Sequence, residues 1–208
     1  VSGEIEAFGA HYLEEMRGIA EGAGLALQDI IMINARTEVL ARARAIMQVA
    51  APAQEPEDGC TGAIILPERS QNGQLLHGQN WDWRAASAET SVVLRITRED
   101  GPDILTFVEA GGLARSGLNS AGIAITANYL ECERDYTGSG VPLSLLRRKV
   151  LEQSEFALAF QAVMRMPKLC SNNIMISTAE GFGVDIECAP DEGFHILPED
   201  GLLVHANH

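Results

Sequence analysis

The stretch Asp58-Gly-Cys-Thr-Gly-Ala-Ile-Ile-Leu66 marks the point at which this sequence changes character. The residues that lead into it, 50–59, are acidic and rich in proline and show no hydrophobic periodicity, so they predict an exposed linker. From Cys60 onward, short apolar or alternating runs separated by glycine turns predict β-strands. The dipeptide Gly59-Cys60 therefore joins a linker to the first strand of a β-rich body.

The residues before the linker are predicted to be helical. Apolar side chains recur every three or four positions from Ile5 to Ile19, and Gly22 and Gly24 then break the pattern. A second helix is expected to follow Gln28-Asp29, because an acidic side chain is favourable near the positive N-terminus of a helix. Residues 1–59 are thus predicted to be a helical segment that ends in the linker.

Residues 60–208 show the pattern of antiparallel strands with two helices among them. Asn72-Gly73 is a strong hairpin signal, and Asp100-Gly-Pro102 marks another reversal of the chain. Helices are expected at about 142–152 and 154–166. Strands are expected at residues 60–66, 75–80, 91–97, 104–109, 116–128 (as a pair), 173–177 and 182–187. This order predicts an α+β fold in which helices cover the sheets.

Charge and cysteine usage narrow the class of protein. The 208 residues carry 29 acidic and 15 basic side chains, a formal net charge of −14, which argues against a nucleic-acid partner or an anionic membrane surface. No apolar run approaches the roughly 20 residues that a membrane-spanning helix needs. The four cysteines form no CxxC pair, so neither a zinc ribbon nor a thioredoxin-like site is expected. Free thiols in a reducing cytoplasm are the default expectation.

Both ends of the sequence are expected to be cut. Val1 already lies within a helical pattern, and His208 follows an apolar run with no turn after it. We therefore expect the fold to be incomplete at both ends and residues 60–208 to be truncated at the C-terminus. A signal peptide lost with the start would allow secretion, so the expected cytoplasmic location leaves that route open.

Cys60 carries the strongest chemical signal. If the chain were cut before it, the thiol would be the nucleophile and its own α-amine, with a pKa of about 7.7–8.0 in peptides, would accept the proton. A glycine at position 59 adds little hindrance to attack of the thiol on the preceding carbonyl, the N-to-S shift that self-cleavage needs. The alternative is a small apolar cysteine that starts a core strand.

Several motifs accompany this dipeptide in order. Asp58-Gly-Cys-Thr61, Gly78-Gln-Asn-Trp-Asp82, Gly117-Leu-Asn-Ser-Ala-Gly122 and Val204-His-Ala-Asn-His208 together resemble the acyl-coenzyme A:6-aminopenicillanic acid acyltransferase family. That family is a self-processing cysteine peptidase family among the N-terminal nucleophile hydrolases. Asn34-Ala-Arg-Thr-Glu38 is similar to the family's segment ahead of the processing site. Each motif is weak alone, but together they cover nearly the whole chain.

The resemblance implies self-cleavage between Gly59 and Cys60. It would leave a small α subunit, residues 1–59, and a larger catalytic β subunit, residues 60–208, headed by Cys60. It implies an αββα sandwich with the new N-terminus in a pocket at one end of the sheets. The expected assembly is an α/β heterodimer, which can form higher oligomers.

Roles for further residues follow from the same motifs. Asp82 is expected to orient the Cys60 amine and adjust its pKa, and Asn207 to offer its side-chain NH₂ to the oxyanion. Asn128 and Thr61 are expected to make further polar contacts with the oxyanion or the substrate. Each has a structural alternative: Asp82 as a turn residue, Asn207 as a buried structural amide, and Asn128 as the end of a strand.

The expected activity is that of an N-terminal nucleophile amidohydrolase or acyltransferase. Its substrate would be a small-molecule amide with a non-peptide C–N bond, or an acyl thioester such as that of coenzyme A. No cofactor and no metal are expected, and neither nucleic acid nor membrane is an expected partner. The pair His205-x-x-His208 is unpromising for a metal, because a spacing of three along a strand puts the two side chains on opposite faces.

Two other classes of protein stay open. In a papain-like thiol hydrolase, Cys60 would pair with His205 or His208 as base and no cleavage would be needed. In a non-enzymatic relative, the fold would serve for binding alone.

Overall fold

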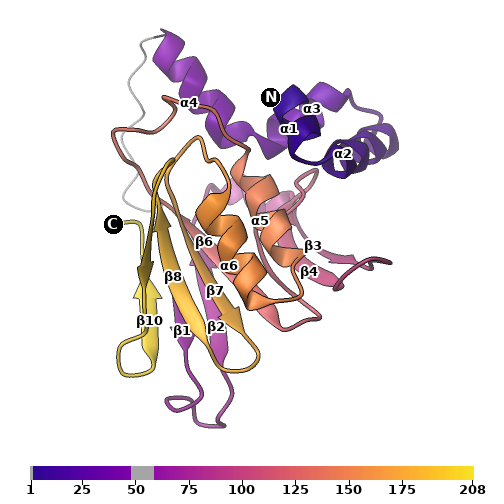
Figure 1. Ribbon diagram of the computed structural model, residues 1–208. Helices are drawn as coiled ribbons and strands as arrows, with labels where there is room; N and C mark the ends of the chain where they lie inside the picture. Colours follow the sequence, from indigo (N-terminus) through magenta and orange to yellow (C-terminus); the bar gives the residue numbers. More distant parts are fainter. Residues whose placement is uncertain (1, 48–58) are drawn as a thin grey trace.

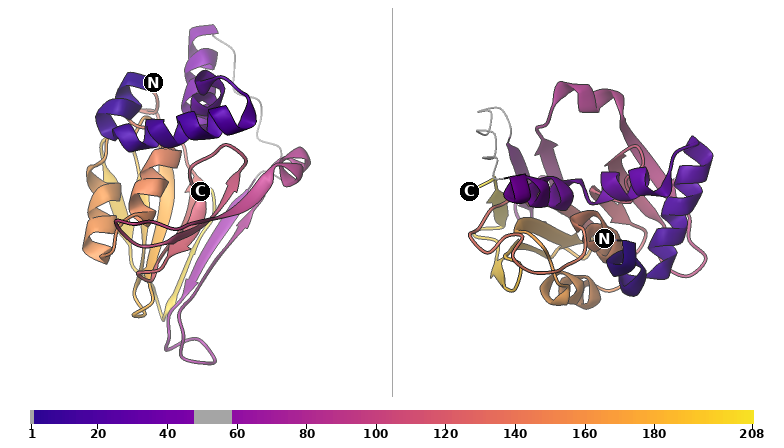
Figure 2. Two further views of the ribbon diagram at one scale, coloured as in Figure 1. Left: turned by 90° about the vertical axis from the view of Figure 1, so that its right-hand side faces the viewer. Right: turned by 90° about the horizontal axis from the view of Figure 1, so that it is seen from above.

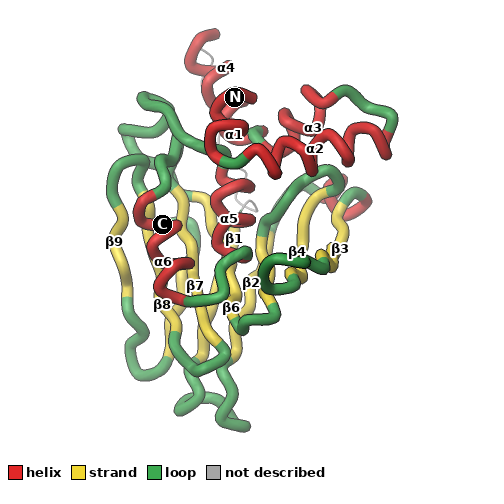
Figure 3. Tube along the Cα trace, turned by 45° about the vertical axis from the view of Figure 1, so that its right-hand side comes forward, coloured by secondary structure: helices red, strands yellow, loops and turns green. Residues whose placement is uncertain are grey.

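Seven antiparallel strands form the larger of two sheets in the computed structural model, which describes residues 2–47 and 59–208 (Figure 1). The strand order is β3-β4-β5-β6-β7-β8-β9, so each strand pairs with its neighbours in sequence, and β3 and β9 are the two edges (Figure 3). The bounds are β3 Ser91–Ile96, β4 Ile104–Glu109, β5 Ser116–Asn119, β6 Ile123–Tyr129, β7 Asn172–Thr178, β8 Gly183–Cys188 and β9 Gly193–Ile196. A short 3₁₀ helix, Ala85–Glu89, precedes β3.

The smaller sheet has three strands in the order β10-β1-β2, all antiparallel. They are β1 Cys60–Ile65, β2 Leu76–Trp81 and β10 Leu202–His205. The turn between β1 and β2 contains Gly73 at φ 68°, a left-handed conformation that favours glycine. β1 is the central strand of this sheet. Its first residue, Cys60, therefore lies between β2, the next strand in sequence, and the C-terminal segment that contains β10.

The two sheets pack face to face through small and apolar side chains. Ile64, Met175 and Leu203 form a buried cluster between them. Gly62 is needed at this contact, since a Cβ added there would lie 2.5 Å from the Met175 sulfur. The central strand of the small sheet therefore lies close against the middle of the large sheet.

A buried histidine also joins the two sheets. The ring nitrogens of His77 on β2 lie 2.8 Å from the Ser177 hydroxyl and 2.9 Å from the Thr126 hydroxyl. Burial lowers the pKa of His77 to about 4. This imidazole is therefore neutral at pH 7, and its role is structural, because it links β2 to the large sheet.

Two helices cover the opposite face of the large sheet. They are α5 Leu143–Leu151 and α6 Phe156–Arg165, and their apolar faces complete the main core with β4 to β8. Seen edge-on, the layers follow one another as helices, large sheet and small sheet (Figure 2). The expected α+β class, with helices packed on antiparallel sheets, is confirmed.

The segment before the linker lies across one end of these layers (Figures 1 and 2). Its helices are α1 Ser2–Phe8, α2 Ala10–Ala23, α3 Leu27–Asn34 and α4 Arg36–Met47. It is attached to the end of α5: the Tyr12 hydroxyl donates to Glu152 at 2.7 Å, and Arg148 pairs with Glu15 at 2.8 Å. The predicted break is present, because α2 ends at Gly24 with φ 66°. The expected second helix is interrupted at Ala35.

Most expected strands and helices are present within a residue or two of their predicted bounds. Strands β9 and β10 were not predicted as such, and each has only four residues. The predicted linker lies outside the described residues except for Gly59. No helix in residues 2–47 or 59–208 is long and apolar enough to cross a bilayer.

Asn119, in the motif that ends β5, connects the turn after this strand to the end of α5. Its amide makes four hydrogen bonds to main-chain groups, with the carbonyls of Leu151 and Gln153 and the N–H groups of Ala121 and Ile123. Asn119 is 4% exposed. If its side chain were removed, the four main-chain groups would lose their partners at a place that water reaches poorly.

We expect Asn119→Ala to lower the free energy of unfolding by about 2 kcal/mol or more, because each buried group left unpaired costs about 1–3 kcal/mol. Urea unfolding followed by circular dichroism measures the loss. The matched control is Asn72→Ala in the exposed hairpin, where Asn72 bonds to nearby Ser70 and Gln74. Equal stabilities of the two variants would contradict the role given to Asn119.

Candidate active site

Cys60 is the first residue of β1 and is half-buried. Side chains alternate along a strand, so Cys60 shares a face with Gly62 and Ile64, which pack against the large sheet. The thiol therefore points toward the space between the sheets. Burial raises the pKa of the Cys60 thiol above its ordinary value, and this is the largest influence on it.

Asn207 lies against the peptide bond between Gly59 and Cys60. Its Oδ1 accepts a hydrogen bond from the Cys60 N–H, and its Nδ2 donates to the carbonyl of Tyr129 at 2.7 Å. A Cβ added at Gly59 would lie 3.7 Å from this Oδ1, an ordinary contact. The site therefore has room for a small side chain at position 59.

Asp82 directly follows β2, whose last residue, Trp81, is paired with Cys60. The backbone N–H of Asp82 donates to the Cys60 sulfur and lowers the thiol pKa, whereas the nearby carboxylate raises it. Three residues separated by up to 147 positions, Cys60, Asp82 and Asn207, are thus brought together at one end of the small sheet.

Two arginines that the sequence did not single out also act on the thiol. The positive charges of Arg115 and Arg147 both lower the pKa of Cys60. The guanidinium carbon of Arg115 lies 4.6 Å from the centre of the Trp81 ring, and Trp81 is the cross-strand partner of Cys60. A single arginine in a loop or a helix forms no recognisable sequence motif. Its proximity to the thiol follows from the tertiary fold and could not be predicted from the sequence.

Asn128 is buried and fully occupied by other groups. Its Nδ2 donates to the carbonyls of His205 and Ala206 at 2.9 and 3.2 Å, and its Oδ1 accepts from Gln79 at 2.8 Å. Gln79 in turn accepts from the Ser116 hydroxyl at 2.7 Å. This network holds the end of β10, directly before Asn207.

Thr61 lies on the other face of β1. It is exposed, whereas its neighbours Cys60 and Gly62 face the large sheet. The structure therefore does not bring the Thr61 side chain to the thiol.

His205 is buried beside acidic groups instead of the thiol. Its Nε2 lies 2.8 Å from Glu187 Oε1, and its Nδ1 contacts the carbonyl of Ala206. His208 is exposed. Both ring nitrogens of His205 thus have other partners, which leaves the papain-like Cys–His pair without geometric support. Within residues 2–47 and 59–208, no group of three or more His, Cys, Asp or Glu side chains is arranged to hold a metal ion.

These charges predict how substitutions move the pKa of the Cys60 thiol. We expect Arg115→Gln to raise it, because a stabilising positive charge is lost, and Asp82→Asn to lower it, because the carboxylate is removed while its backbone N–H stays. The measurement is the pH dependence of iodoacetamide alkylation of the peptide that contains Cys60, followed by mass spectrometry. Arg17→Gln, on the exposed face of α2, is the control and should leave the profile unmoved. Shifts in the reverse directions would contradict this arrangement of charges.

A family profile and a curated relative both point to the same protein family. The profile of the family described as acyl-coenzyme A:6-aminopenicillanic acid acyl-transferase matches residues 69–208. The 40 kDa form of acyl-coenzyme A:6-aminopenicillanic-acid-acyltransferase from Emericella nidulans is 31% identical over 203 residues, which are 95% of this chain and 51% of that protein. The chain thus spans about half the length of this curated relative.

Solved structures share the fold at low sequence identity. The Caenorhabditis elegans orthologue of N-acylethanolamine-hydrolyzing acid amidase superposes with a TM-score of 0.56 at 19% identity, covering 71% of this chain and 70% of that one. A point mutant of conjugated bile acid hydrolase from Clostridium perfringens gives a TM-score of 0.51 at 15% identity, covering 69% of this chain and 52% of that one. These likenesses confirm the N-terminal nucleophile hydrolase fold.

The family profile covers two thirds of the chain and includes three of the segments around the thiol, those of Asp82, Arg115 and Asn207. The fold and the order of the motifs agree with this match. The chain belongs to the acyl-coenzyme A:6-aminopenicillanic acid acyltransferase family.

Proposed function

We propose that this chain is a self-cleaving amidohydrolase or acyltransferase whose nucleophile is Cys60 at a newly made N-terminus. The observation that carries the proposal is the position of Cys60 at the start of a central strand, with Asn207 on its peptide nitrogen and Asp82 beside its sulfur. Family membership and the fold support the same class of chemistry.

Self-cleavage begins with attack of the Cys60 sulfur on the carbonyl carbon of Gly59. The carbon–nitrogen bond between the two residues breaks, the thiol proton ends on the departing nitrogen, and a thioester forms. Water then hydrolyses the thioester and leaves a carboxylate on Gly59 and a free amine on Cys60. Asn207 Oδ1 fixes the orientation of the scissile peptide by accepting its N–H.

Turnover then uses the thiol and the new amine together. The amine takes the thiol proton as the sulfur attacks an amide or thioester carbonyl, and the carbonyl oxygen becomes an oxyanion. Collapse breaks the bond to the leaving amine or thiol, which receives the proton, and leaves an acyl group on Cys60. Water or an amine finally takes the acyl group, giving hydrolysis or transfer according to which of them reaches it.

Asn207 changes partners between the two stages. After cleavage its Oδ1 can accept from the new amine, and its Nδ2, which has two hydrogens, can give one to the oxyanion while the other stays on the Tyr129 carbonyl. Asn128 supports it by fixing the carbonyls of the two preceding residues. Asp82 holds the amine on the side of the sulfur through its carboxylate.

The first prediction concerns cleavage. We expect the purified wild-type protein to consist of two polypeptides, the larger starting at Cys60-Thr61-Gly62, and Cys60→Ala to stay a single chain without turnover. Intact mass spectrometry with N-terminal sequencing measures both. Cys132→Ala is the control, because this half-buried thiol bonds to Asp135 and its loss should leave cleavage intact. Cleavage at Gly59 in the Cys60→Ala variant would contradict the proposal.

The second prediction concerns the oxyanion. We expect Asn207→Leu to lower kcat for N-acyl p-nitroanilides by about 10²–10³-fold, the usual loss for one oxyanion donor. The rate is normalised to the cleaved fraction, so that slow processing is not mistaken for slow turnover. Asn80→Leu is the matched control, since Asn80 is exposed on the face of β2 that points away from the large sheet. A cleaved Asn207→Leu protein with the wild-type kcat would remove Asn207 from this role.

A further inference from the structure

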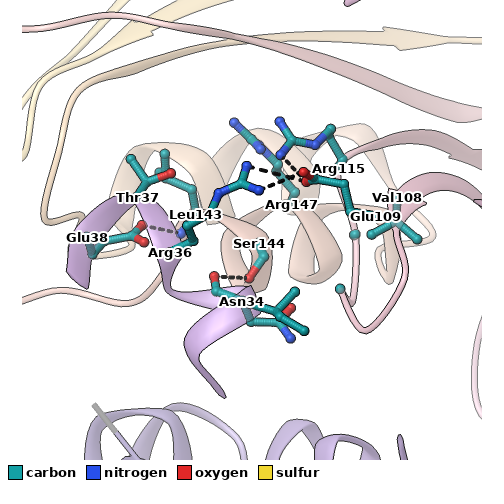
Figure 4. A pocket seen from close by; sticks show the side chains of 13 residues that line it. Asn34, Arg36, Thr37, Glu38, Val108, Glu109, Arg115, Leu143, Ser144 and Arg147 are labelled. Atoms are coloured by element: carbon teal, nitrogen blue, oxygen red, sulfur yellow. Dashed lines mark hydrogen bonds and ion pairs between the residues drawn. The ribbon is translucent and has the colours of Figure 1, made fainter. Parts of the chain in front are cut away.

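A pocket next to the catalytic thiol lies where the segment before the cleavage site meets the β-rich body (Figure 4). It is bounded by the end of α3, the start of α4, the loop after β4 and the first turns of α5, and its cavity has a volume of about 40 Å³. Its charged lining residues are Arg36, Glu38, Glu109, Arg115 and Arg147.

Positive charge exceeds negative charge in this pocket. Glu109 is shared by two arginines, with Arg36 at 2.6 Å and Arg115 at 2.5 Å. The carboxylate of Glu38 accepts the backbone N–H of Leu143 at 2.8 Å, and burial raises its pKa, which favours its neutral form. Three guanidinium groups are therefore opposed by one fully ionised carboxylate and one whose ionisation is disfavoured.

Arg147 is the least compensated of these guanidinium groups. Its side chain lies in the pocket and the residue is 9% exposed, yet its Nε has no hydrogen-bond partner among the described residues. Burial lowers the pKa of Arg147 to about 10, and the neighbouring Arg115 adds to this effect, so the group still carries its charge at pH 7. The charge of Glu38 acts in the opposite sense, but Arg147 Nε still has no hydrogen-bond acceptor among the described residues, and an anion in the pocket would supply one.

The pocket and the nucleophile adjoin each other. Arg115 and Arg147 both influence the Cys60 thiol, and Arg115 stacks on Trp81, which is paired with Cys60. Figure 4 shows the guanidinium groups of Arg36, Arg115 and Arg147 gathered around Glu109. Arg115 therefore links this pocket to the strand pair that carries Cys60.

We propose that this pocket is a carboxylate-binding subsite, in which Arg147 and Arg115 hold a carboxylate of the amide substrate while its acyl carbon meets Cys60. Arg36 acts as a positioning residue, because it holds Glu109, and Glu109 orients Arg115. The subsite rests on the proposed function, since it names the class of substrate that Cys60 would attack. Arg36 also makes the segment before the cleavage site a part of substrate recognition.

A carboxylate fits this pocket better than the phosphates of coenzyme A. The planar fork of a guanidinium matches the two oxygens of a carboxylate. The phosphates of an acyl-coenzyme A stand a long pantetheine arm away from the thioester, whereas Arg115 stacks on Trp81, the cross-strand partner of Cys60. The anion recognised here therefore belongs to a compact molecule.

The test compares substrates that differ only in this charge. N-acylglycines with acyl chains from acetyl to decanoyl are assayed beside the corresponding N-acylglycinamides, which are neutral. We expect the wild-type protein to favour the acids by about tenfold or more in kcat/KM, because a charge-assisted bidentate contact is lost in the amides. In Arg147→Met and in Arg115→Gln the preference should fall toward one, mainly through a higher KM for the acids. Arg17→Gln, outside the pocket, should keep it.

A second measurement separates the failure of the subsite from the failure of the proposed function. Isothermal titration of the same acids and glycinamides measures recognition without turnover in two proteins, the uncut Cys60→Ala protein and the wild-type protein with its Cys60 thiol capped by methyl methanethiosulfonate. Thermal melting confirms that the arginine variants are folded. Tighter binding of the acids, lost in Arg147→Met, supports the subsite even if no substrate is hydrolysed, an outcome that would count against the proposed function alone. Hydrolysis of acids and glycinamides at equal rates, or equal binding of the two, overturns the subsite and leaves the Cys60 chemistry standing.

Discussion

The pairing of β1 between β2 and β10 is the constraint on which the site depends. These strands come from residues 60–65, 76–81 and 202–205, and their antiparallel register places Asp82 beside the Cys60 sulfur and Asn207 at the Cys60 N–H. The register is fixed by burial, because a shift of one residue would turn Ile64 and Leu203 out of the core between the sheets. Gly62 allows this strand to approach Met175 closely. Packing between the sheets therefore determines the geometry at Cys60.

Electrostatics at the thiol is a balance of opposing influences. Burial and the Asp82 carboxylate favour the neutral thiol, while the Asp82 N–H, Arg115 and Arg147 favour the thiolate. In the intact chain burial prevails, so Cys60 is held in its protonated form near neutral pH. A free α-amine next to the sulfur would add a base that the uncut chain lacks. The chemistry proposed for the mature protein is thus coupled to the cut itself.

The sequence predicted most of the secondary structure but only part of the site. Local signals such as Asn72-Gly73 and the periodicity of residues 5–19 were sufficient for hairpins and helices, whereas β9 and β10, with four residues each, were too short to give a pattern. Asp82 and Asn207 came from family motifs, since an isolated Asp or Asn has no periodicity to reveal its role. Arg115 and Arg147 belong to different elements, so their approach to Cys60 could be known only from the tertiary structure.

A buried apolar cluster and several ion pairs join the helical segment to the body, and the ion pairs would matter most in the proposed two-chain form. Burial raises the pKa of Glu109, but the hydrogen bonds and charges of Arg36 and Arg115 more than offset it, so the net pKa is low. Its pair with Arg36 thus contributes above the ordinary glutamate pKa and is lost as the pH falls through the lowered value. The part-buried ion pairs of this junction, Arg36–Glu109 and Arg148–Glu15, also weaken to some degree as salt screens them. If the chain is cut as proposed, salt and dilution would loosen these ion pairs, while the packing of Leu113 and Leu145 against the helical segment would still hold the pieces together.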